Sequence, residues 1–192
     1  ITANSDTLGL DKTRIDIDQN GFIKVNDYLE TSLEGVYSFG DIIGRYFFRH
    51  TANFEGQYLF DSQFKSDQPS PIKYKPVPYA MFTHPQIAGV GLTENDAKSA
   101  AVDVVIGKNA YISSAMGSAL RSDHGFVKLL FERGSKRLVG AHIVGREAST
   151  MIHMLIAFMV MQGTYEDVLE MIYIHPALPE IVRNAARKVV FD

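Results

Sequence analysis

The chain has 192 residues, a hydrophobic content of 46%, a charged content of 21% and a formal net charge of -3 at pH 7. These values are ordinary for a globular protein and exclude a strongly basic surface, so no nucleic-acid partner is expected. The absence of cysteine excludes disulfides, thiolate nucleophiles and cysteine-ligated metals within the chain. Its length suits one large domain, or one domain with part of another.

The amino end and the apolar stretches bear on the expected location. Residues 1–6 have no initiator methionine, no basic region and no apolar core, so they do not resemble a signal peptide. The longest apolar run, residues 151–161, is far shorter than the roughly 20 residues that cross a bilayer. We expect a soluble, cytoplasmic protein without a membrane partner, whose first residues read like a chain entered midway.

Two elements are predicted in the first third of the chain. Apolar residues recur through residues 14–25 on both sides of Asn20 and Gly21, which tolerate the positive φ of a hairpin turn. This pattern predicts two short strands joined by a tight turn. Residues 50–59 favour a helix that offers apolar side chains for packing.

Between these elements, residues 35–41 predict a buried strand that ends in Gly40 and Asp41. Ligands of open α/β sheets bind beyond the carboxyl ends of strands, where Asp41 would offer an acceptor to a hydroxyl-bearing ligand. The alternative is that Asp41 is a turn residue that caps the next segment. These residues alone leave both interpretations open.

A cluster of prolines marks the predicted domain boundary. Residues 67–78 contain four of the 7 prolines of the chain, with Ser and Lys between them. Such a composition is typical of a linker. We therefore expect residues 1–66 and residues 79–192 to belong to separate domains.

The residues after the prolines contain several strand patterns. Strands are predicted over residues 79–82, 87–91, 102–110, 126–131 and 138–144. Thr93 is predicted to cap a short helix that runs through residues 97–101. Because several strands follow one another without an intervening helix, we predict an antiparallel sheet in an α+β fold.

Two further helices are predicted near the carboxyl end. Residues 147–162 have an apolar surface wider than one stripe, so this helix should be buried on more than one side, at the domain centre or against another subunit. Thr164 is predicted to cap a second, short helix. Its inward-facing side chains would be Val168, Leu169, Met171 and Ile172.

The segment Tyr173–Glu180 brings a histidine and a carboxylate to the start of a helix. His175 precedes a proline, which favours an extended backbone, and Pro179 and Glu180 suit a first helical turn. An apolar face over residues 181–190 would dock this helix. Glu180 could then bind one imidazole nitrogen of His175 and leave the other free to exchange protons.

Other interpretations of this pair stay open. His175 could be a buried or turn histidine beside a favourable first-turn charge, or the pair could activate water in a hydrolase. No spacing typical of metal-ligating histidines occurs, and His142 and His153 are expected to be satisfied core histidines. We therefore expect no metal site.

Three motifs resemble those of the FAD-dependent pyridine nucleotide-disulfide oxidoreductases. Residues 31–41 (TSLEGVYSFGD) are similar to the second flavin-binding motif of that family, and residues 84–94 (HPQIAGVGLTE) to the start of its carboxy-terminal dimerisation domain. His175 with Glu180 resembles the family's catalytic His-Glu pair. The motifs occur in the family's order and look most like the dihydrolipoyl dehydrogenase and mycothione reductase members.

This resemblance implies an architecture and a cofactor. Residues 1–66 would be the carboxy-terminal piece of an α/β FAD-binding domain. Residues 79–192 would be the dimerisation domain, an antiparallel sheet with flanking helices. The implied FAD-binding residues are Gly40, Asp41, His50, Thr51 and Ala52.

The resemblance also implies a reaction shared by two chains. His175, oriented by Glu180, would act across a homodimer interface on the partner's redox cysteines, in an enzyme that passes electrons between NAD(P)H, FAD, a disulfide and a lipoyl or small-molecule dithiol. The family's GxGxxG segment, cysteine pair and nucleotide domain are absent from these residues, so the fragment alone is expected to be inactive. Alternatives are a mycothione, glutathione or mercuric reductase specificity, or a stand-alone dimerisation module without catalysis.

Overall fold

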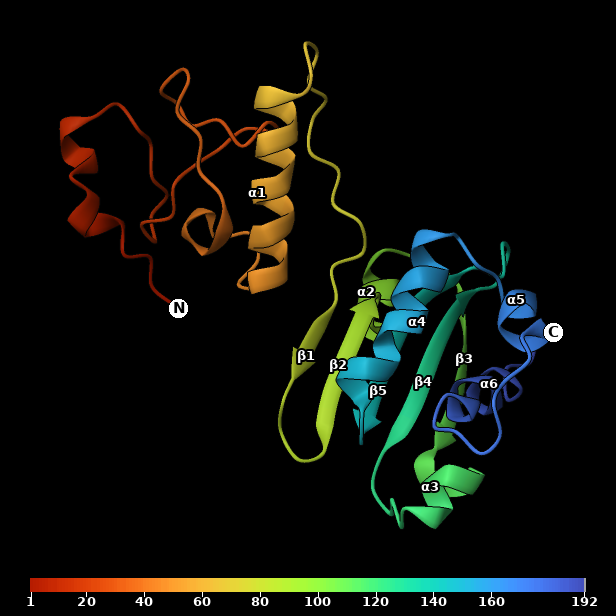
Figure 1. Ribbon diagram of the computed structural model, residues 1–192. Coiled ribbons are helices and arrows are strands. Elements are labelled where there is room, and N and C mark those ends of the chain that lie inside the picture. Colours follow the sequence, from red (N-terminus) through yellow and green to blue (C-terminus); the bar gives the residue numbers. More distant parts are fainter. Residues whose placement is uncertain (192) are drawn as a thin grey trace. The chain divides into compact units, whose positions relative to one another are not determined.

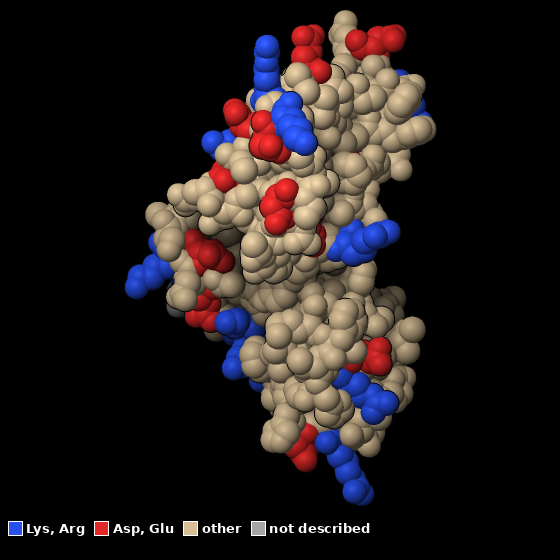
Figure 2. All heavy atoms as spheres, turned by 90° about the vertical axis from the view of Figure 1, so that its left-hand side faces the viewer, with Lys and Arg blue, Asp and Glu red and all other residues tan. Residues whose placement is uncertain are grey.

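The structure, a computed structural model, describes residues 1–191. The chain divides after Tyr74 into two units, residues 1–74 and the residues from Lys75 onward. The first unit contains one long helix among loops and short helical turns, and the second is built on a sheet (Figure 1). Acidic and basic side chains are interspersed on the face shown in Figure 2, in keeping with the small net charge of -3. Within residues 1–191, no helix is long and apolar enough to cross a lipid bilayer.

The division between the units falls inside residues 67–78, the expected linker. Part of this segment packs onto the first unit, because the Tyr58 hydroxyl donates to the Ser70 carbonyl at 2.8 Å. Ile72 is buried in the first unit's core. Ile72 therefore belongs to the packing of the first unit rather than to a free linker.

The second unit contains a five-stranded antiparallel sheet with the strand order β1-β2-β5-β4-β3. Central strand β5 places His142 opposite Gly89 of β2 and opposite Lys128 of β4. The predicted antiparallel sheet is confirmed, and the strands lie close to their predicted bounds. They are β1 (Tyr79–Met81), β2 (Gln86–Gly91), β3 (Val104–Ala110), β4 (Phe126–Glu132) and β5 (Leu138–Gly145).

Two helices, α4 (Ala148–Val160) and α6 (Glu180–Ala186), pack on this sheet (Figure 1). α4 contacts β2 and β5, whereas α6 contacts β3 and β4. One hydrophobic core joins Leu129 of the sheet to Leu155 of α4 and Ile181 of α6. Burial of this shared apolar surface holds both helices against the strands.

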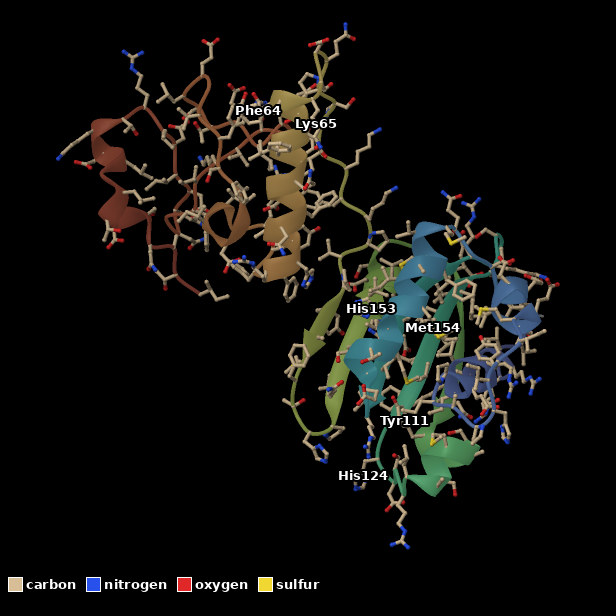
Figure 3. All side chains as sticks on the ribbon, viewed as in Figure 1. Phe64, Lys65, Tyr111, His124, His153 and Met154 are labelled. Carbon is tan, nitrogen blue, oxygen red and sulfur yellow. The ribbon has the colours of Figure 1, made fainter. Side chains whose placement is uncertain are left out.

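α4 is buried on one side only. Met151, Ile152 and Leu155 are buried, whereas His153 and Ala157 are exposed. Burial on more than one side, which we expected, is not found within residues 75–191 because the sheet covers a single face of the helix. His153 was expected to be a core histidine, and this expectation is wrong, since the helix carries it on the open side (Figure 3).

Side-chain caps start two short helices. The Thr93 hydroxyl accepts from the backbone N–H of Asp96, whose carboxylate accepts from the Thr93 N–H, at the start of α2 (Glu94–Ser99). Ser114 caps α3 (Ala115–Ala119) in a similar way. The predicted cap at Thr93 is therefore confirmed. Its capping box satisfies two backbone N–H donors at once, which stabilises the start of the helix.

A second capping box begins α5 (Tyr165–Glu170) at Thr164, as predicted. Val168 is buried, in agreement with its predicted inward position. Met171 and Ile172, however, are 39% and 99% exposed. The prediction was wrong for these two residues because the helix ends at residue 170, after which the chain leaves its inward face.

The first unit is organised around α1 (Arg49–Phe64), which extends the predicted helix by a turn at its carboxyl end. Short 3-10 helices supply the remaining regular structure: η1 (Ser5–Leu8), η2 (Leu10–Lys12) and η3 (Gly40–Ile43), with η4 (Tyr111–Ser113) in the second unit. A small core around Leu29 and Ile43 joins η3 to α1.

The hairpin predicted at residues 14–25 is reduced to an isolated bridge between Ile17 and Ile23. The Asp18 carboxylate accepts the backbone N–H groups of Asn20 and Phe22 at 2.8 and 2.9 Å. This side chain takes the donors that a strand ladder would use, so the turn forms without two regular strands.

The strand predicted over residues 35–41 is also absent. Tyr37 forms an isolated bridge with Glu30, and the backbone then turns into η3 at Gly40. Gly35 and Gly40 have φ angles of 76° and 78°, a conformation outside the strand region that glycine adopts without strain. Two such glycines interrupt the extended backbone.

Candidate functional site

His175 and Glu180 lie within hydrogen-bond distance at the start of α6. The Nδ1 atom of His175 is 3.1 Å from each carboxylate oxygen of Glu180. Glu180 is buried, whereas the His175 side chain is 67% exposed. A carboxylate at Nδ1 favours the tautomer in which Nδ1 donates and Nε2 accepts. The exposed edge of the ring can therefore exchange a proton with a group outside this chain.

Two further donors fix the Glu180 carboxylate. The backbone N–H of Ala177 donates to it at 3.1 Å, and the Arg183 guanidinium donates at 3.0 Å. The bond from Ala177, followed by that from His175, holds the pKa of Glu180 below its ordinary value. The carboxylate is therefore ionised at neutral pH and remains an acceptor for His175.

Arg183 is positioned by the aromatic ring of Tyr173. The guanidinium carbon lies 5.3 Å from the centre of that ring, within cation–π range. The Tyr173 hydroxyl donates to the Val168 carbonyl at 2.8 Å, and burial raises the pKa of Tyr173 to about 12. The hydroxyl therefore stays protonated, and the loop before His175 is tied to both α5 and α6.

The position of Glu180 also depends on how closely α6 packs against β3. A methyl group at Gly107 of β3 would lie 2.2 Å from the Ala185 carbonyl oxygen of α6. A glycine at this position therefore permits the close approach of helix and strand. Ile181 and Val182, which follow Glu180, are fully buried, so the first turn of α6 is anchored in the core.

An apolar cavity of about 440 Å³ borders the loop that carries His175. The sequence did not indicate this cavity, because its walls come from α3, from α4 and from residues 176–179. Met154 contributes from α4 (Figure 3). The other apolar lining residues include Met116, Leu120, Met151 and Leu178.

The residues expected to bind a cofactor gather in the first unit, where η3 meets the start of α1. A methyl group at Gly40 would lie 3.3 Å from the Cβ atom of Ala52. Asp41 is exposed, and His50 stacks on a neighbouring phenylalanine ring with centroids 5.1 Å apart. The Thr51 hydroxyl is buried and has no hydrogen-bond partner among residues 1–191.

This group has the chemistry of a site for a polar ligand. The exposed carboxylate of Asp41 can accept hydrogen bonds from hydroxyl groups. The first backbone N–H groups of α1 carry partial positive charge, and the unpaired Thr51 hydroxyl adds a donor and an acceptor. A ligand rich in hydroxyl, carbonyl or phosphate oxygens would satisfy all three.

Glu55 is a buried polar residue that sequence reasoning did not single out. Its carboxylate accepts the Gly40 N–H at 2.6 Å and the Tyr74 hydroxyl at 2.6 Å. These partners are 15 and 19 residues away along the chain. No local sequence pattern reports contacts of that separation.

Within the part of the chain that the structure describes, no three His, Asp or Glu side chains group together as metal ligands. His142 is half-buried, and its Nε2 atom lies 3.0 Å from the Leu92 carbonyl oxygen. It is thus a hydrogen-bonded histidine of the sheet, as expected.

Comparison with known proteins defines the class to which this fold and site belong. The family described as "Pyridine nucleotide-disulphide oxidoreductase, dimerisation domain" matches residues 77–186, and the one described as "Pyridine nucleotide-disulphide oxidoreductase" matches residues 1–56. The chain therefore belongs to the pyridine nucleotide-disulphide oxidoreductases. Members of this family are enzymes that bind FAD and NAD(P).

Individual relatives agree with this assignment. The chain is similar to mycothione reductase from Mycobacterium tuberculosis (39% identical over 188 residues, 95% of this chain and 41% of the relative). It is also similar to dihydrolipoyl dehydrogenase from Zymomonas mobilis (32% identical over 185 residues, 96% of this chain and 40% of the relative). The chain thus spans about two fifths of the curated relatives that it matches.

Two solved structures share the fold. LpdA from Mycobacterium tuberculosis superposes with a TM-score of 0.86 at 24% identity, over 97% of this chain and 40% of that one. The HOCl-induced flavoprotein disulfide reductase RclA from Escherichia coli superposes with a TM-score of 0.86 at 18% identity, over 98% of this chain and 42% of that one.

Proposed function

We propose that this chain is the carboxy-terminal part of an FAD-dependent disulfide oxidoreductase and supplies its acid/base pair. The observation that carries the proposal is the contact between His175 Nδ1 and the buried carboxylate of Glu180, with the imidazole otherwise exposed. Membership of the oxidoreductase family supports the reaction class. The redox cysteines would come from residues outside this chain.

In this proposal, His175 holds and returns a proton at Nε2. An enzyme thiolate that attacks a substrate disulfide forms a mixed disulfide and releases a substrate thiolate, which takes the proton from Nε2. In the opposite direction, Nε2 takes the proton of an attacking substrate thiol. Glu180 stabilises the imidazolium in both directions, because its ionised carboxylate stays at Nδ1.

We propose FAD as the ligand of the group around Gly40. FAD, when bound, relays two electrons between NAD(P)H and a redox disulfide. Asp41 would accept hydrogen bonds from hydroxyl groups of the ligand. His50, Thr51 and Ala52 would present the positive end of α1, and the unpartnered Thr51 hydroxyl supports a polar ligand there.

We further propose a homodimer in which each active site combines two chains. The unit that contains His175 matches the family's dimerisation domain, and its exposed imidazole is available to a second subunit. The substrate would be a dithiol or disulfide. A lipoyl group and a mycothiol-type disulfide are the alternatives, since relatives named for both activities match the chain.

Replacement of His175 with Ala in the full-length parent protein tests the catalytic assignment. We expect disulfide turnover to fall by about 10²- to 10⁴-fold, the usual contribution of a general acid or base. Flavin reduction by NAD(P)H should proceed at the wild-type rate, because it does not need the His175 proton. Steady-state turnover and stopped-flow flavin absorbance measure the two steps separately.

The matched control is His124→Ala, which removes an exposed histidine of the same unit (Figure 3). It should leave both rates unchanged. Wild-type turnover by the His175→Ala protein would reject the acid/base assignment and leave this chain with a role in dimerisation alone.

A further inference from the structure

The acidic residue Glu55 is almost completely inside the first unit. Its side chain extends from the second turn of α1, and only 1% of the residue is exposed. One carboxylate oxygen, Oε2, accepts the Gly40 N–H at 2.6 Å, and the other, Oε1, accepts the Tyr74 hydroxyl at 2.6 Å. Among residues 1–191, no Lys, Arg or His forms an ion pair with it.

A carboxylate in such a place is costly unless each oxygen is hydrogen-bonded. An apolar side chain could fill the same volume without that cost, so packing alone does not account for an acid here. Its two bonds connect segments on opposite sides of it in sequence, the η3 turn and the extended stretch that ends at Tyr74. The carboxylate therefore specifies where these backbones lie.

The hydrogen bond between Glu55 and the Gly40 N–H restrains a glycine whose backbone has little conformational preference of its own. Gly40 has a φ of 78°, and glycine enters this region without strain but is not confined to it. Ala52 limits the space on one side, since a methyl group at Gly40 would be 3.3 Å from its Cβ atom. The hydrogen bond that the Gly40 N–H donates to Glu55 adds a further restraint on the turn that carries Asp41.

We propose that Glu55 is a positioning residue for the cofactor site: its carboxylate fixes the Gly40 N–H and thereby orients Asp41 toward the start of α1. This inference rests on the proposed binding of FAD at these residues. Glu55 does not touch the ligand in this scheme. It determines the geometry in which Asp41 and the first turn of α1 are presented together.

Tyr74 keeps the carboxylate in this orientation. Burial, and then the hydrogen bond to Glu55, raises the pKa of Tyr74 to about 12. The hydroxyl therefore remains a donor across the neutral range and occupies Oε1, which leaves Oε2 for Gly40. Arg45 lies 5.9 Å from the centre of the Tyr74 ring and helps to hold that ring in place.

The test measures FAD affinity of the apo form of the full-length parent protein by flavin fluorescence, with no turnover involved. Glu55→Asp shortens the side chain by one methylene and withdraws the acceptor from Gly40. We expect its dissociation constant for FAD to rise by ~10- to 100-fold, the loss associated with one charged hydrogen bond. Glu55→Gln keeps an acceptor oxygen at this length and should retain most of the affinity.

Two controls separate positioning from general destabilisation. Tyr74→Phe removes the other bond of the same carboxylate and should weaken FAD binding less than Glu55→Asp does. Ser5→Ala removes a buried hydroxyl of the same unit, which donates to the Gly21 carbonyl at 2.6 Å, and it lowers the melting temperature at residues outside the core that contains η3. Its FAD affinity, measured below its melting temperature, should match that of the wild type.

If the wild type binds FAD and the Glu55→Asp protein binds it with the same dissociation constant, the positioning role of Glu55 is overturned. The role is also rejected if Ser5→Ala, compared at a matched loss of melting temperature, weakens FAD binding as much as Glu55→Asp does. Failure of the wild-type protein to bind FAD would be a different result, since it rejects the proposed function together with this inference.

Discussion

Glu180 serves several structural purposes through one carboxylate. It accepts from His175, from the Ala177 backbone and from Arg183, so every bond that fixes the acid also fixes the imidazole beside it. The short sequence separation made this contact predictable. Glu55 was not predictable in the same way, because a buried acid is recognised only when its distant partners, Gly40 and Tyr74, are known.

The lowered pKa of Glu180 predicts how its contribution to stability depends on pH. Its ordinary pKa is 4.5, and the folded protein holds it below that value. The stabilisation is therefore complete above pH 4.5 and is lost as the pH falls through the folded-state pKa. Urea unfolding of the wild type and of Glu180→Gln should differ most at neutral pH, and the difference should shrink below pH 4.5. A difference that grows on acidification would contradict the assignment.

At the level of elements, the close packing of α6 on β3 holds Glu180 in place, because this residue begins a helix that is fixed against the sheet. The two caps at Thr93 and Thr164 were predicted because each box lies within four residues of sequence. The prediction of a strand over residues 35–41 was wrong because two glycines there adopt positive φ angles. The contact of Gly107 with Ala185 joins segments that no local pattern connects.

Gly107→Ala tests this support. The added methyl would lie 2.2 Å from the Ala185 carbonyl oxygen, so α6 must shift away from β3. We expect a loss of about 1–3 kcal/mol of unfolding free energy, as for other overpacked sites, together with reduced disulfide turnover in the parent protein. The matched control is Gly134→Ala in an exposed turn, where a methyl would have no neighbour within 4 Å. Equal unfolding midpoints in urea for the two variants would contradict the prediction.

At the level of the whole molecule, one side of α4 has no covering layer within residues 75–191 of its own unit. The side that faces the sheet carries Met151 and Leu155, and the open side carries His153 and Ala157. The broad apolar pattern of this helix was visible in the sequence, but the pattern could not say whether the sheet or a second subunit covers each side. The match to a dimerisation domain favours a second subunit on the open side.

Ala157→Glu in the full-length protein tests that arrangement. A charge in the middle of the open side of α4 should be desolvated on association, so we expect the dimer to weaken and the sedimentation coefficient to fall toward that of a monomer. Ala100→Glu makes the same substitution at an exposed position after α2 and should leave the dimer intact. Indistinguishable sedimentation of the two variants would place the interface elsewhere.

The short sequence separation between His175 and Glu180 has a consequence for how the site forms. The two residues are five positions apart, and Gly40 and Glu55 are fifteen apart. Closing loops of this length costs little entropy compared with the long-range pairing of β2 with β5. Each pair is therefore assembled by its own stretch of chain once the adjoining helix docks. The strands then influence the His175–Glu180 pair only through the docking of α6.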